Sequence, residues 1–345
     1  MKYKLAFIGF GVVGQGLTEI LLEKKEMLKE KYDLDFTVVA ISDFMKGSVY
    51  DEKGLDMKLI LDLVNKGRKI DEYPNGKKGM DSLQTIKETN ADVIIEVTYT
   101  DVKTGEPALT HIKTALEHKK HVISTNKGPV VKEVQNLIKL AKKNKVHYGF
   151  EGVVLAGTPS INLAQYTLAG NIISGFKGIL NGTTNYILTR MEEGMSYEEA
   201  LKKAQELGYA EADPTGDVEG LDALGKVVIL SNVVLGKNIT WDQVERKGIT
   251  DISIEDISKA KAEGKRWKLI GKAELREDGS FFAKVAPEKL PLNDPLAGVM
   301  GATNALTFET DELGSVTIVG PGAGKRETGF SLLIDLLNIN RKMSD

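Results

Sequence analysis

The first 150 residues alternate short apolar runs with longer segments in which apolar residues recur every three or four positions. The runs have the length of buried strands, and the longer segments have the periodicity of amphipathic helices. The expected strands cover residues 5–9, 36–42, 93–97, 121–124 and 146–150, and the expected helices cover residues 13–31, 54–66, 82–89, 107–119 and 130–143. This alternation predicts a doubly wound parallel sheet with helices on its faces.

The pattern changes near residue 151. Helices are expected near residues 160–169, 197–207, 217–236 and 328–338, and a further helix is expected after a turn at residues 181–185. Extended segments are expected at residues 172–180, 265–275, 281–285, 305–310 and 316–319, with a hairpin turn at residues 277–279. This half predicts an α+β fold. We therefore expect two domains, residues 1–150 and 151–320, and the chain is long enough for each to bury a core.

The charge balance excludes some classes of partner. Lys and Arg total 46 and Asp and Glu total 49, a formal charge of −3, so nucleic acid is not expected as a main partner. No apolar run reaches the roughly 18–20 residues that cross a bilayer. The apolar start resembles a signal peptide, but a glycine-rich loop stands where a cleavage site would be expected. We therefore expect a soluble protein of the cytoplasm with no membrane partner.

The chain has no cysteine, which excludes disulfides and every mechanism that uses a thiolate nucleophile. The histidines are His111, His118, His121 and His147, and they show no zinc-ligand spacing. We expect the first two on a surface helix and the others near strand starts, all with structural roles.

Gly9, Gly11 and Gly14 form a Gly-x-Gly-x-x-Gly motif where the first expected strand meets the first expected helix. Glycines at these positions let the backbone approach a pyrophosphate, and the helix N-terminus offers unpaired N–H groups. Such a motif is weak alone, because glycines also fill ordinary turns, but its place in a βαβ unit makes it specific. We expect a Rossmann-type dinucleotide site that includes Val12 and Val13.

The end of the second expected strand carries residues that bear on the choice of cofactor. Asp43 can accept a hydrogen bond from the ribose 2′-hydroxyl of NAD, whereas Lys46 can attract the 2′-phosphate of NADP. The sequence leaves NAD and NADP open.

Residues 208–226 gather acidic side chains just before a lysine on an apolar helix. Asp222 and Lys226 are four residues apart and share a helix face, and most such pairs are solvent-exposed and contribute only about 0.2–0.5 kcal/mol. The rest of this helix is apolar on nearly all sides, which is typical of a buried helix. A buried ion pair rarely adds net stability, so we favour a site that binds a polar ligand or moves a proton. Asp217 is expected to cap this helix.

A glycine-rich loop at residues 320–324 precedes the last expected helix. It can contact an anion or a cofactor, and it can equally be a plain tight turn.

Seven segments in order, residues 9–14, 96–98, 124–129, 151–159, 180–188, 207–226 and 320–324, resemble homoserine dehydrogenase over essentially the whole chain. The resemblance implies reversible hydride transfer between NAD(P)H and L-aspartate 4-semialdehyde, which gives L-homoserine, in threonine and methionine biosynthesis. It also implies a homodimer formed through the second domain, and a final segment, residues 321–345, that returns to the first domain.

The resemblance places the family's catalytic lysine at Lys226 and its substrate-binding acids at Glu211 and Asp222, with Asp217 in the same pocket. An ammonium aimed at the carbonyl oxygen stabilises the negative charge that develops during reduction and can supply the proton. Carboxylates can pair with the substrate's own ammonium.

Cofactor-side residues follow in the same way. The resemblance places a second catalytic lysine between cofactor and substrate at Lys127, a nicotinamide neighbour at Thr98 and a further cofactor contact at Gly324. It places a monovalent-cation loop, for Na⁺ or K⁺, at Glu151, Val154, Ala156 and Thr158. That loop departs from the commoner glycine-rich version.

Two other classes of function compete with this interpretation. Another two-domain reductase, such as a dihydrodipicolinate reductase or a relative of inositol-phosphate synthase, shares the glycine loop but lacks the acidic cluster. A redox-sensing regulator would need a DNA-binding module or a basic patch, and the sequence shows neither. The sequence ends about where the family's catalytic core ends, so we expect no inhibition by threonine through an appended domain.

Overall fold

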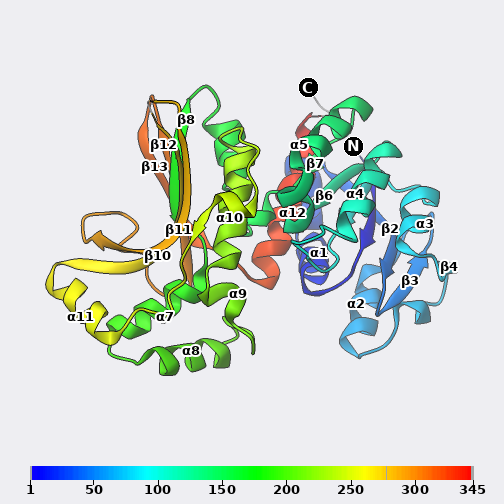
Figure 1. Cartoon of the computed structure of the whole chain (residues 1–345). Helices are drawn as coiled ribbons and strands as arrows, with labels where there is room; N and C mark the ends of the chain where they lie inside the picture. The colour runs from blue at the N-terminus through cyan, green and yellow to red at the C-terminus, as the bar shows by residue number, and fades with distance from the viewer. Residues whose placement is uncertain (1, 277, 343–345) are drawn as a thin grey trace. The chain divides into compact units, whose positions relative to one another are not determined.

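The computed structural model describes residues 2–276 and 278–342 and divides into two compact units (Figure 1). Unit 1 comprises residues 1–157 and 324–345, and unit 2 comprises residues 158–323. Glu277 of the expected hairpin turn and the last three residues of the expected returning segment lie outside the described residues.

Unit 1 is built on a sheet with the strand order β4-β3-β2-β1-β5-β6-β7. Its strands are Lys2–Ile8 (β1), Asp35–Asp43 (β2), Gly47–Tyr50 (β3), Lys77–Lys78 (β4), Val93–Glu96 (β5), His121–Ser124 (β6) and Tyr148–Gly149 (β7). Neighbouring strands in the series β2-β1-β5-β6-β7 pair in parallel, whereas β3 pairs antiparallel with β2 and with β4. The doubly wound sheet is therefore confirmed, with an antiparallel edge that the apolar pattern did not reveal.

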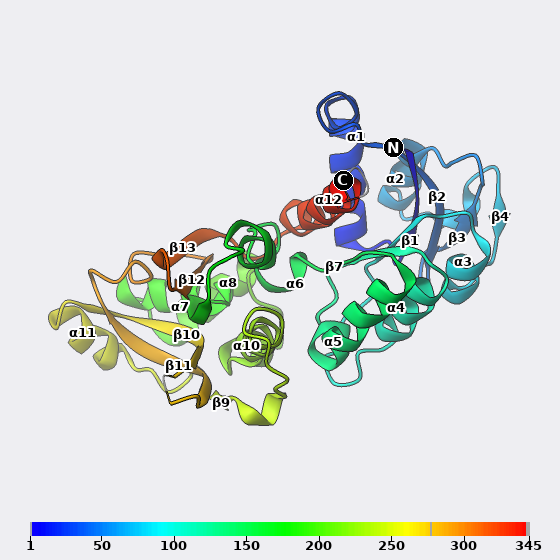
Figure 2. The same cartoon turned by 90° about the horizontal axis from the view of Figure 1, so that it is seen from above.

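Two groups of helices cover this sheet (Figure 2). They are Val12–Tyr32 (α1), Met57–Asn65 (α2), Ile70–Glu72 (η1), Ser82–Glu88 (α3), Ala108–Glu117 (α4), Lys127–Asn144 (α5), Gly152–Leu155 (α6) and Lys325–Lys342 (α12). Leucines and isoleucines of α1, α2 and α12 share one buried cluster with β1 and β2. The helices α3, α4 and α5 pack against one another and onto the strands.

The helix α12 lies against α1 within unit 1, although some 300 residues separate them in the chain. Two glycines make the crossing close: a Cβ on Gly16 would lie 2.3 Å from the backbone oxygen of Lys325, and one on Gly329 would lie 2.6 Å from the backbone nitrogen of Leu17. Side chains at these positions would force the helices apart.

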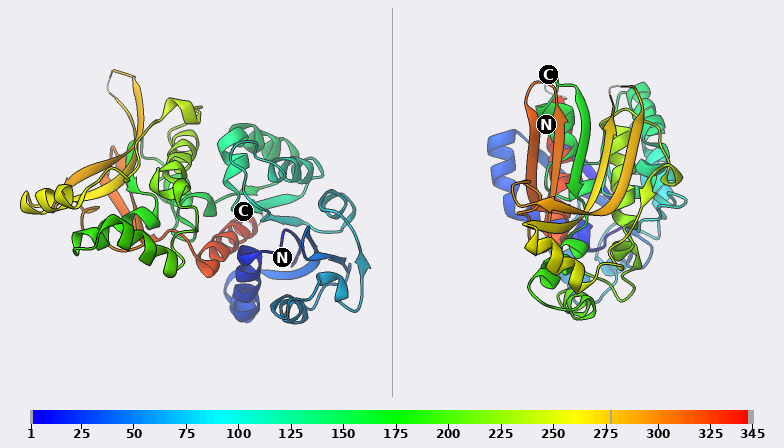
Figure 3. Two further views of the ribbon diagram at one scale, coloured as in Figure 1. Left: turned by 60° about the horizontal axis from the view of Figure 1, so that its bottom comes forward. Right: turned by 60° about the vertical axis from the view of Figure 1, so that its left-hand side comes forward.

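Unit 2 contains a sheet with the order β13-β12-β8-β10-β11-β9, and the long strands of this sheet can be followed by colour in Figure 3. The strands are Ile173–Ile179 (β8), Glu245–Arg246 (β9), Lys265–Leu275 (β10), Phe281–Pro291 (β11), Thr303–Thr310 (β12) and Gly314–Pro321 (β13). All neighbours pair antiparallel except β9 and β11. This is the expected α+β arrangement.

The helices of unit 2 are Leu163–Thr167 (η2), Gly182–Glu192 (α7), Tyr197–Glu206 (α8), Thr215–Val218 (α9), Leu221–Val233 (α10), Trp241–Gln243 (η3) and Ile254–Ala262 (α11). The helix α10 packs against β10 and β11, and α7 packs against β10 and β12. The helix expected at residues 160–169 covers residues 161–167, most of which form η2, and α11 was not expected at all. No helix among the described residues is long and apolar enough to cross a membrane.

Candidate active site

The turn from β1 to α1 fits a dinucleotide in unit 1. Gly9 has φ +86, and a Cβ there would lie 2.6 Å from the backbone oxygen of Val97. Only glycine therefore fits where these two backbone segments approach each other. Gly11 is the N-cap of α1 and has open space where its Cβ would be. A glycine has no side chain with which to cap the helix, so the first N–H groups of α1 remain available to an anion.

The position of this turn in the sheet also favours a ligand. Strand β1 lies between β2 and β5, where the order of the strands reverses. Ligands of open α/β sheets bind outside the carboxyl ends of the strands at such a point. Gly9, Asp43 and Thr98 follow or end the three adjoining strands.

Asp43 at the end of β2 is held rigidly. One carboxylate oxygen accepts from the backbone N–H of Phe10 at 2.7 Å, and the other accepts from Met45 and Lys46 at 2.9 and 2.8 Å. The Lys46 Nζ lies 3.8 Å away. The carboxylate is therefore fixed against the glycine-rich turn, next to the exposed side chain of Phe44.

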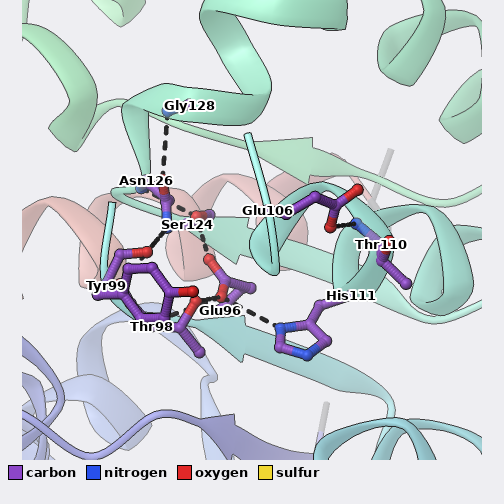
Figure 4. A network of polar contacts seen from close by, with 9 residues as sticks. All are labelled: Glu96, Thr98, Tyr99, Glu106, Thr110, His111, Ser124, Asn126 and Gly128. Carbon is purple, nitrogen blue, oxygen red and sulfur yellow. Dashed lines mark hydrogen bonds and ion pairs between the residues drawn. The ribbon is translucent and has the colours of Figure 1, made fainter. Parts of the chain in front are cut away.

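Thr98 lies in the loop that follows β5, and Asn126 lies between β6 and α5 (Figure 4). Lys127 is the first residue of α5, where the side chain of Asn126 caps the helix by accepting from Gly128 N at 3.2 Å. The Asn126 Nδ2 donates to the carbonyl of Tyr99 at 3.0 Å. The two loops are thus tied together at the same edge of the sheet.

In unit 2, Lys226 lies in the middle of α10 and is 5 % exposed. Its Nζ donates to the carbonyl of Leu180 at 2.6 Å and pairs with Asp222 at 2.8 Å. The neighbouring residues of α10 are buried around most of the helix. The surface-pair interpretation is therefore wrong, because this ammonium is removed from bulk water and held by a carbonyl and a carboxylate.

Asn181 links the acidic groups of this cluster. Its Nδ2 donates to Asp217 at 2.7 Å and to Asp222 at 3.1 Å, while its Oδ1 accepts from the backbone N–H of Thr184 at 2.9 Å. Burial raises the pKa of Asp217, the hydrogen bond from Asn181 lowers it, and the nearby Asp222 raises it, with a net rise. Asn181 is not among the predicted site residues, although an Asn before an expected helix is a capping signal.

The start of α7 adds donors beside this cluster. Asn181 is its N-cap, and no described residue accepts a hydrogen bond from the backbone N–H of Gly182 or Thr183. The hydroxyl of Thr183 donates to the carbonyl of Tyr209. Two acids, one ammonium and two free N–H groups therefore adjoin one another.

One expectation about the acidic segment is wrong, and the substrate-binding role of Glu211 stays a prediction. Asp217 does not cap α10, because it lies inside the separate helix α9 and Gly220, with φ +77, takes the N-cap position. The structure does not bring Glu211 into the cluster: among the described residues its exposed carboxylate makes no hydrogen bond or ion pair. Only its backbone carbonyl is used, by Gln205 at 3.1 Å.

The other predicted positions have plain descriptions. Val12 is exposed and Val13 is half-buried at the start of α1. A Cβ on Gly14 would lie 3.4 Å from the side chain of Val97, so Gly14 packs closely against that residue. Gly324 begins the second segment of unit 1 with φ +133. His111 was expected on a helix surface and is instead buried, because α4 turns it toward β5.

The expected cation loop falls at the boundary of the units. Glu151 is buried, and Ala156 ends α6 with φ +48 and ψ −121, which is rare for a residue with a Cβ. Thr158 begins unit 2, and its hydroxyl donates to the carbonyl of Pro321 at 3.0 Å. Val154 is buried within α6. Residues 2–276 and 278–342 contain no group of three or more His, Asp or Glu side chains that could hold a metal ion.

The dinucleotide-type turn and the buried lysine cluster define a two-domain, NAD(P)-dependent oxidoreductase. Two family models match: "Homoserine dehydrogenase, NAD binding domain" covers residues 9–151, and "Homoserine dehydrogenase" covers residues 159–337. The chain belongs to the homoserine dehydrogenase family. Its reaction is the reversible NAD(P)-dependent hydride transfer between L-homoserine and L-aspartate 4-semialdehyde, so the predicted family, enzyme class and activity are confirmed.

Relatives with this name cover nearly the whole chain. An NAD(+)-dependent homoserine dehydrogenase of Pseudomonas canavaninivorans is 44% identical over 99% of this chain and 97% of its own length. A homoserine dehydrogenase of Methanocaldococcus jannaschii is 46% identical over 97% of this chain and 98% of its own length.

Solved structures agree with this. A crystal structure of a protein assigned as a homoserine dehydrogenase, from Archaeoglobus fulgidus, has a TM-score of 0.88 and 38% identity, covering 98% of this chain and 99% of its own. A hyperthermophilic archaeal homoserine dehydrogenase mutant in complex with NADPH has a TM-score of 0.84 and 29% identity, covering 99% and 98%.

Asp217 yields a prediction about stability. Its pKa in the folded protein lies above the ordinary 3.8, so ionised Asp217 destabilises the fold above that raised pKa, and the penalty is relieved as the pH falls toward 3.8. We predict that Asp217→Asn raises Tm by a few degrees at pH 7 to 8 and that the gain disappears in acid. Differential scanning calorimetry across this pH range measures it.

Asp213 in the same segment is the matched control. A hydrogen bond from Thr215 lowers its pKa, so Asp213→Asn should not stabilise the protein at neutral pH. If the Asp217→Asn variant is less stable than the wild type at pH 8, the ionised carboxylate does not destabilise the folded protein, which contradicts the prediction.

Proposed function

We propose that unit 1 is the cofactor domain and unit 2 is the substrate domain of this enzyme, and that Lys226 is the residue that exchanges a proton with the substrate oxygen. The observation that carries this proposal is the buried Lys226 ammonium, held by Asp222 and by the carbonyl of Leu180. Burial of such a charge costs several kcal/mol, and this ammonium belongs to a cluster with Asp222, Asn181 and Asp217 that suits a polar substrate.

The cluster offers a partner for each polar group of homoserine. The carboxylates of Asp217 and Asp222 suit the substrate ammonium, and Asn181 holds both in place. The free N–H groups of Gly182 and Thr183 at the start of α7 suit the substrate carboxylate, since a helix N-terminus favours an anion. Lys226 is left for the hydroxyl. Glu211 is exposed on the adjoining loop, where it can close over the ammonium.

A nicotinamide dinucleotide supplies the hydride acceptor or donor when it is bound. During reduction the Lys226 ammonium stabilises the negative charge that develops on the substrate oxygen and donates a proton to it. During oxidation the same group, in its neutral amine form, accepts the hydroxyl proton. Asp222 keeps the Lys226 amine oriented through the 2.8 Å contact. On the cofactor side, Gly9, Gly11 and Gly14, with Val12 and Val13, form the pyrophosphate turn.

Three further residues are assigned to the cofactor on the basis of the resemblance. Thr98 and Lys127 follow β5 and β6 at the carboxyl edge of the sheet, which is where ligands of such sheets bind. We assign Thr98 to the nicotinamide and Lys127 to the space between cofactor and substrate. Gly324 precedes α12, and its φ of +133 is a conformation that favours glycine. A glycine has no side chain to obstruct a cofactor.

We also propose that NAD is preferred to NADP. The Asp43 carboxylate is fixed by three backbone N–H groups and faces one cation at 3.8 Å. A fixed negative charge accepts from the ribose 2′-hydroxyl and repels a 2′-phosphate. The relative from P. canavaninivorans is named as NAD(+)-dependent, and a less similar relative was solved with NADPH.

The resemblance carries three more proposals: a homodimer formed through unit 2, a monovalent cation held by Glu151, Val154, Ala156 and Thr158, and a cytoplasmic location. Light scattering should give twice the mass of the chain. Replacing Na⁺ and K⁺ by choline should lower activity, and unchanged activity would remove the cation from the account.

The cofactor proposal predicts the outcome of a direct assay. Homoserine oxidation should show a higher kcat/KM with NAD than with NADP, and Asp43→Asn should lower that ratio at least about tenfold by removing the repulsive charge. Lys46→Met should raise it. A wild-type preference for NADP would contradict the role of Asp43.

The catalytic proposal predicts that Lys226→Met lowers kcat by about 10²–10⁴ with nearly unchanged NADH affinity. The control is Lys268→Met, which removes another buried lysine of unit 2, held by Asn185 and the carbonyl of Val299. This control should lower Tm and keep kcat. Near-normal turnover by Lys226→Met would rule out its role in proton transfer.

A further inference from the structure

Glu96 is a fully buried carboxylate at a place where the mechanism gives it no task. It is the last residue of β5, the strand beside β1, and its exposed fraction is 0 %. The carboxyl edge of β5 is the edge at which Thr98 stands. Figure 4 shows Glu96 among the side chains of the loops that follow β5 and β6.

The two oxygens of Glu96 hold two different loops. Oε1 accepts from the backbone N–H of Thr98 at 3.2 Å and also from its hydroxyl. Oε2 accepts from the hydroxyl of Ser124 at 3.2 Å, and Ser124 Oγ in turn accepts from the backbone N–H of Asn126 at 3.0 Å. Asn126 is the residue that caps α5. One carboxylate therefore reaches Thr98 directly and the start of α5 through Ser124.

This carboxylate has little charge compensation. His111 Nδ1 lies 3.5 Å from Oε1 and makes no hydrogen bond among the described residues. The phenol of Tyr148 is also buried nearby: burial first, and then the charges of Glu96 and Asp335, raise its pKa well above the ordinary value, so it stays neutral. Because a buried charge with incomplete pairing is costly, stability alone gives no reason for a glutamate here.

We propose that Glu96 is a positioning residue that sets the geometry of the nicotinamide end of the cofactor site, by fixing Thr98 with one oxygen and the first turn of α5, with Lys127, through the other. This inference rests on the proposed function, which gives Thr98 and Lys127 to the reacting end of the cofactor. An error of about 1 Å in such a site is enough to lower a rate about 10²-fold. Supporting residues that lock a site in this way act without touching the ligand.

The test compares Glu96→Leu, which removes every acceptor, with Glu96→Gln, which keeps one oxygen for Thr98. The matched control is Lys120→Met. Lys120 is also buried and donates at 2.8 Å to the carbonyls of Thr89 and Ala91, just before the opposite end of β5. Three quantities are measured on each full-length protein: NADH affinity by fluorescence, kcat for homoserine oxidation with its isotope effect from homoserine deuterated at carbon 4, and Tm.

Glu96→Leu should weaken NADH binding, lower kcat at least about tenfold and raise the isotope effect, because a misplaced acceptor slows the hydride step. Glu96→Gln should retain part of kcat. Lys120→Met should lower Tm with kcat and the isotope effect unchanged. Equal NADH affinity and kcat in Glu96→Leu and wild type would overturn the proposal, as would a loss of kcat that Lys120→Met shares in proportion to Tm.

Ser124→Ala keeps the proposal testable if Glu96→Leu does not fold. It breaks only the link to Asn126, so kcat should fall and the isotope effect should rise, and wild-type values for both would overturn the proposal. Failure of the proposed residue roles is a separate result. It would appear as Lys226→Met turning over homoserine at the wild-type rate, while the NADH affinities still test Glu96.

Discussion

Lys226 constrains how the segments of unit 2 pack, because an ammonium buried in an apolar helix must have a polar partner within reach. Asp222 one turn earlier and the carbonyl of Leu180 meet that need. Asn181 follows Leu180 directly and holds Asp222 and Asp217. The end of β8, the start of α7 and the middle of α10 are therefore fixed together by one charge, and the groups that suit an amino-acid substrate gather there as a consequence.

In unit 1 the charged groups that link separate segments are carboxylates and not an ammonium. Asp43 and Glu96 are carboxylates at the carboxyl ends of strands on either side of β1. Asp43 accepts from backbone N–H groups and Glu96 accepts from N–H and O–H groups of the loops that follow the strands, so each carboxylate links loop segments to one another. Acidic residues at this edge order the loops around a ligand more than they stabilise the core, since burying their charge is unfavourable in itself.

Sequence periodicity predicted the alternation of unit 1 because strands and helices buried on one side have distinct spacings of apolar residues. It missed β3 and β4, which are short and pair antiparallel at an edge, and it missed α11, whose buried residues are few. The lysine cluster was found because Lys226 stands in an apolar helix. Three features were missed: the contacts of Asn181, the separation of α9 from α10 at Gly220, and the burial of His111. They depend on contacts between distant segments, which spacing along the chain cannot encode.

The most direct test of the account is a crystal structure of the enzyme with homoserine and a nicotinamide dinucleotide bound. We expect Lys226 Nζ within hydrogen-bonding distance of the homoserine hydroxyl, the substrate ammonium at Asp217 or Asp222, and the carbon that bears the hydroxyl facing the nicotinamide ring. A complex in which Lys226 Nζ remains on Leu180 and Asp222 while the hydroxyl binds another side chain would contradict the central claim.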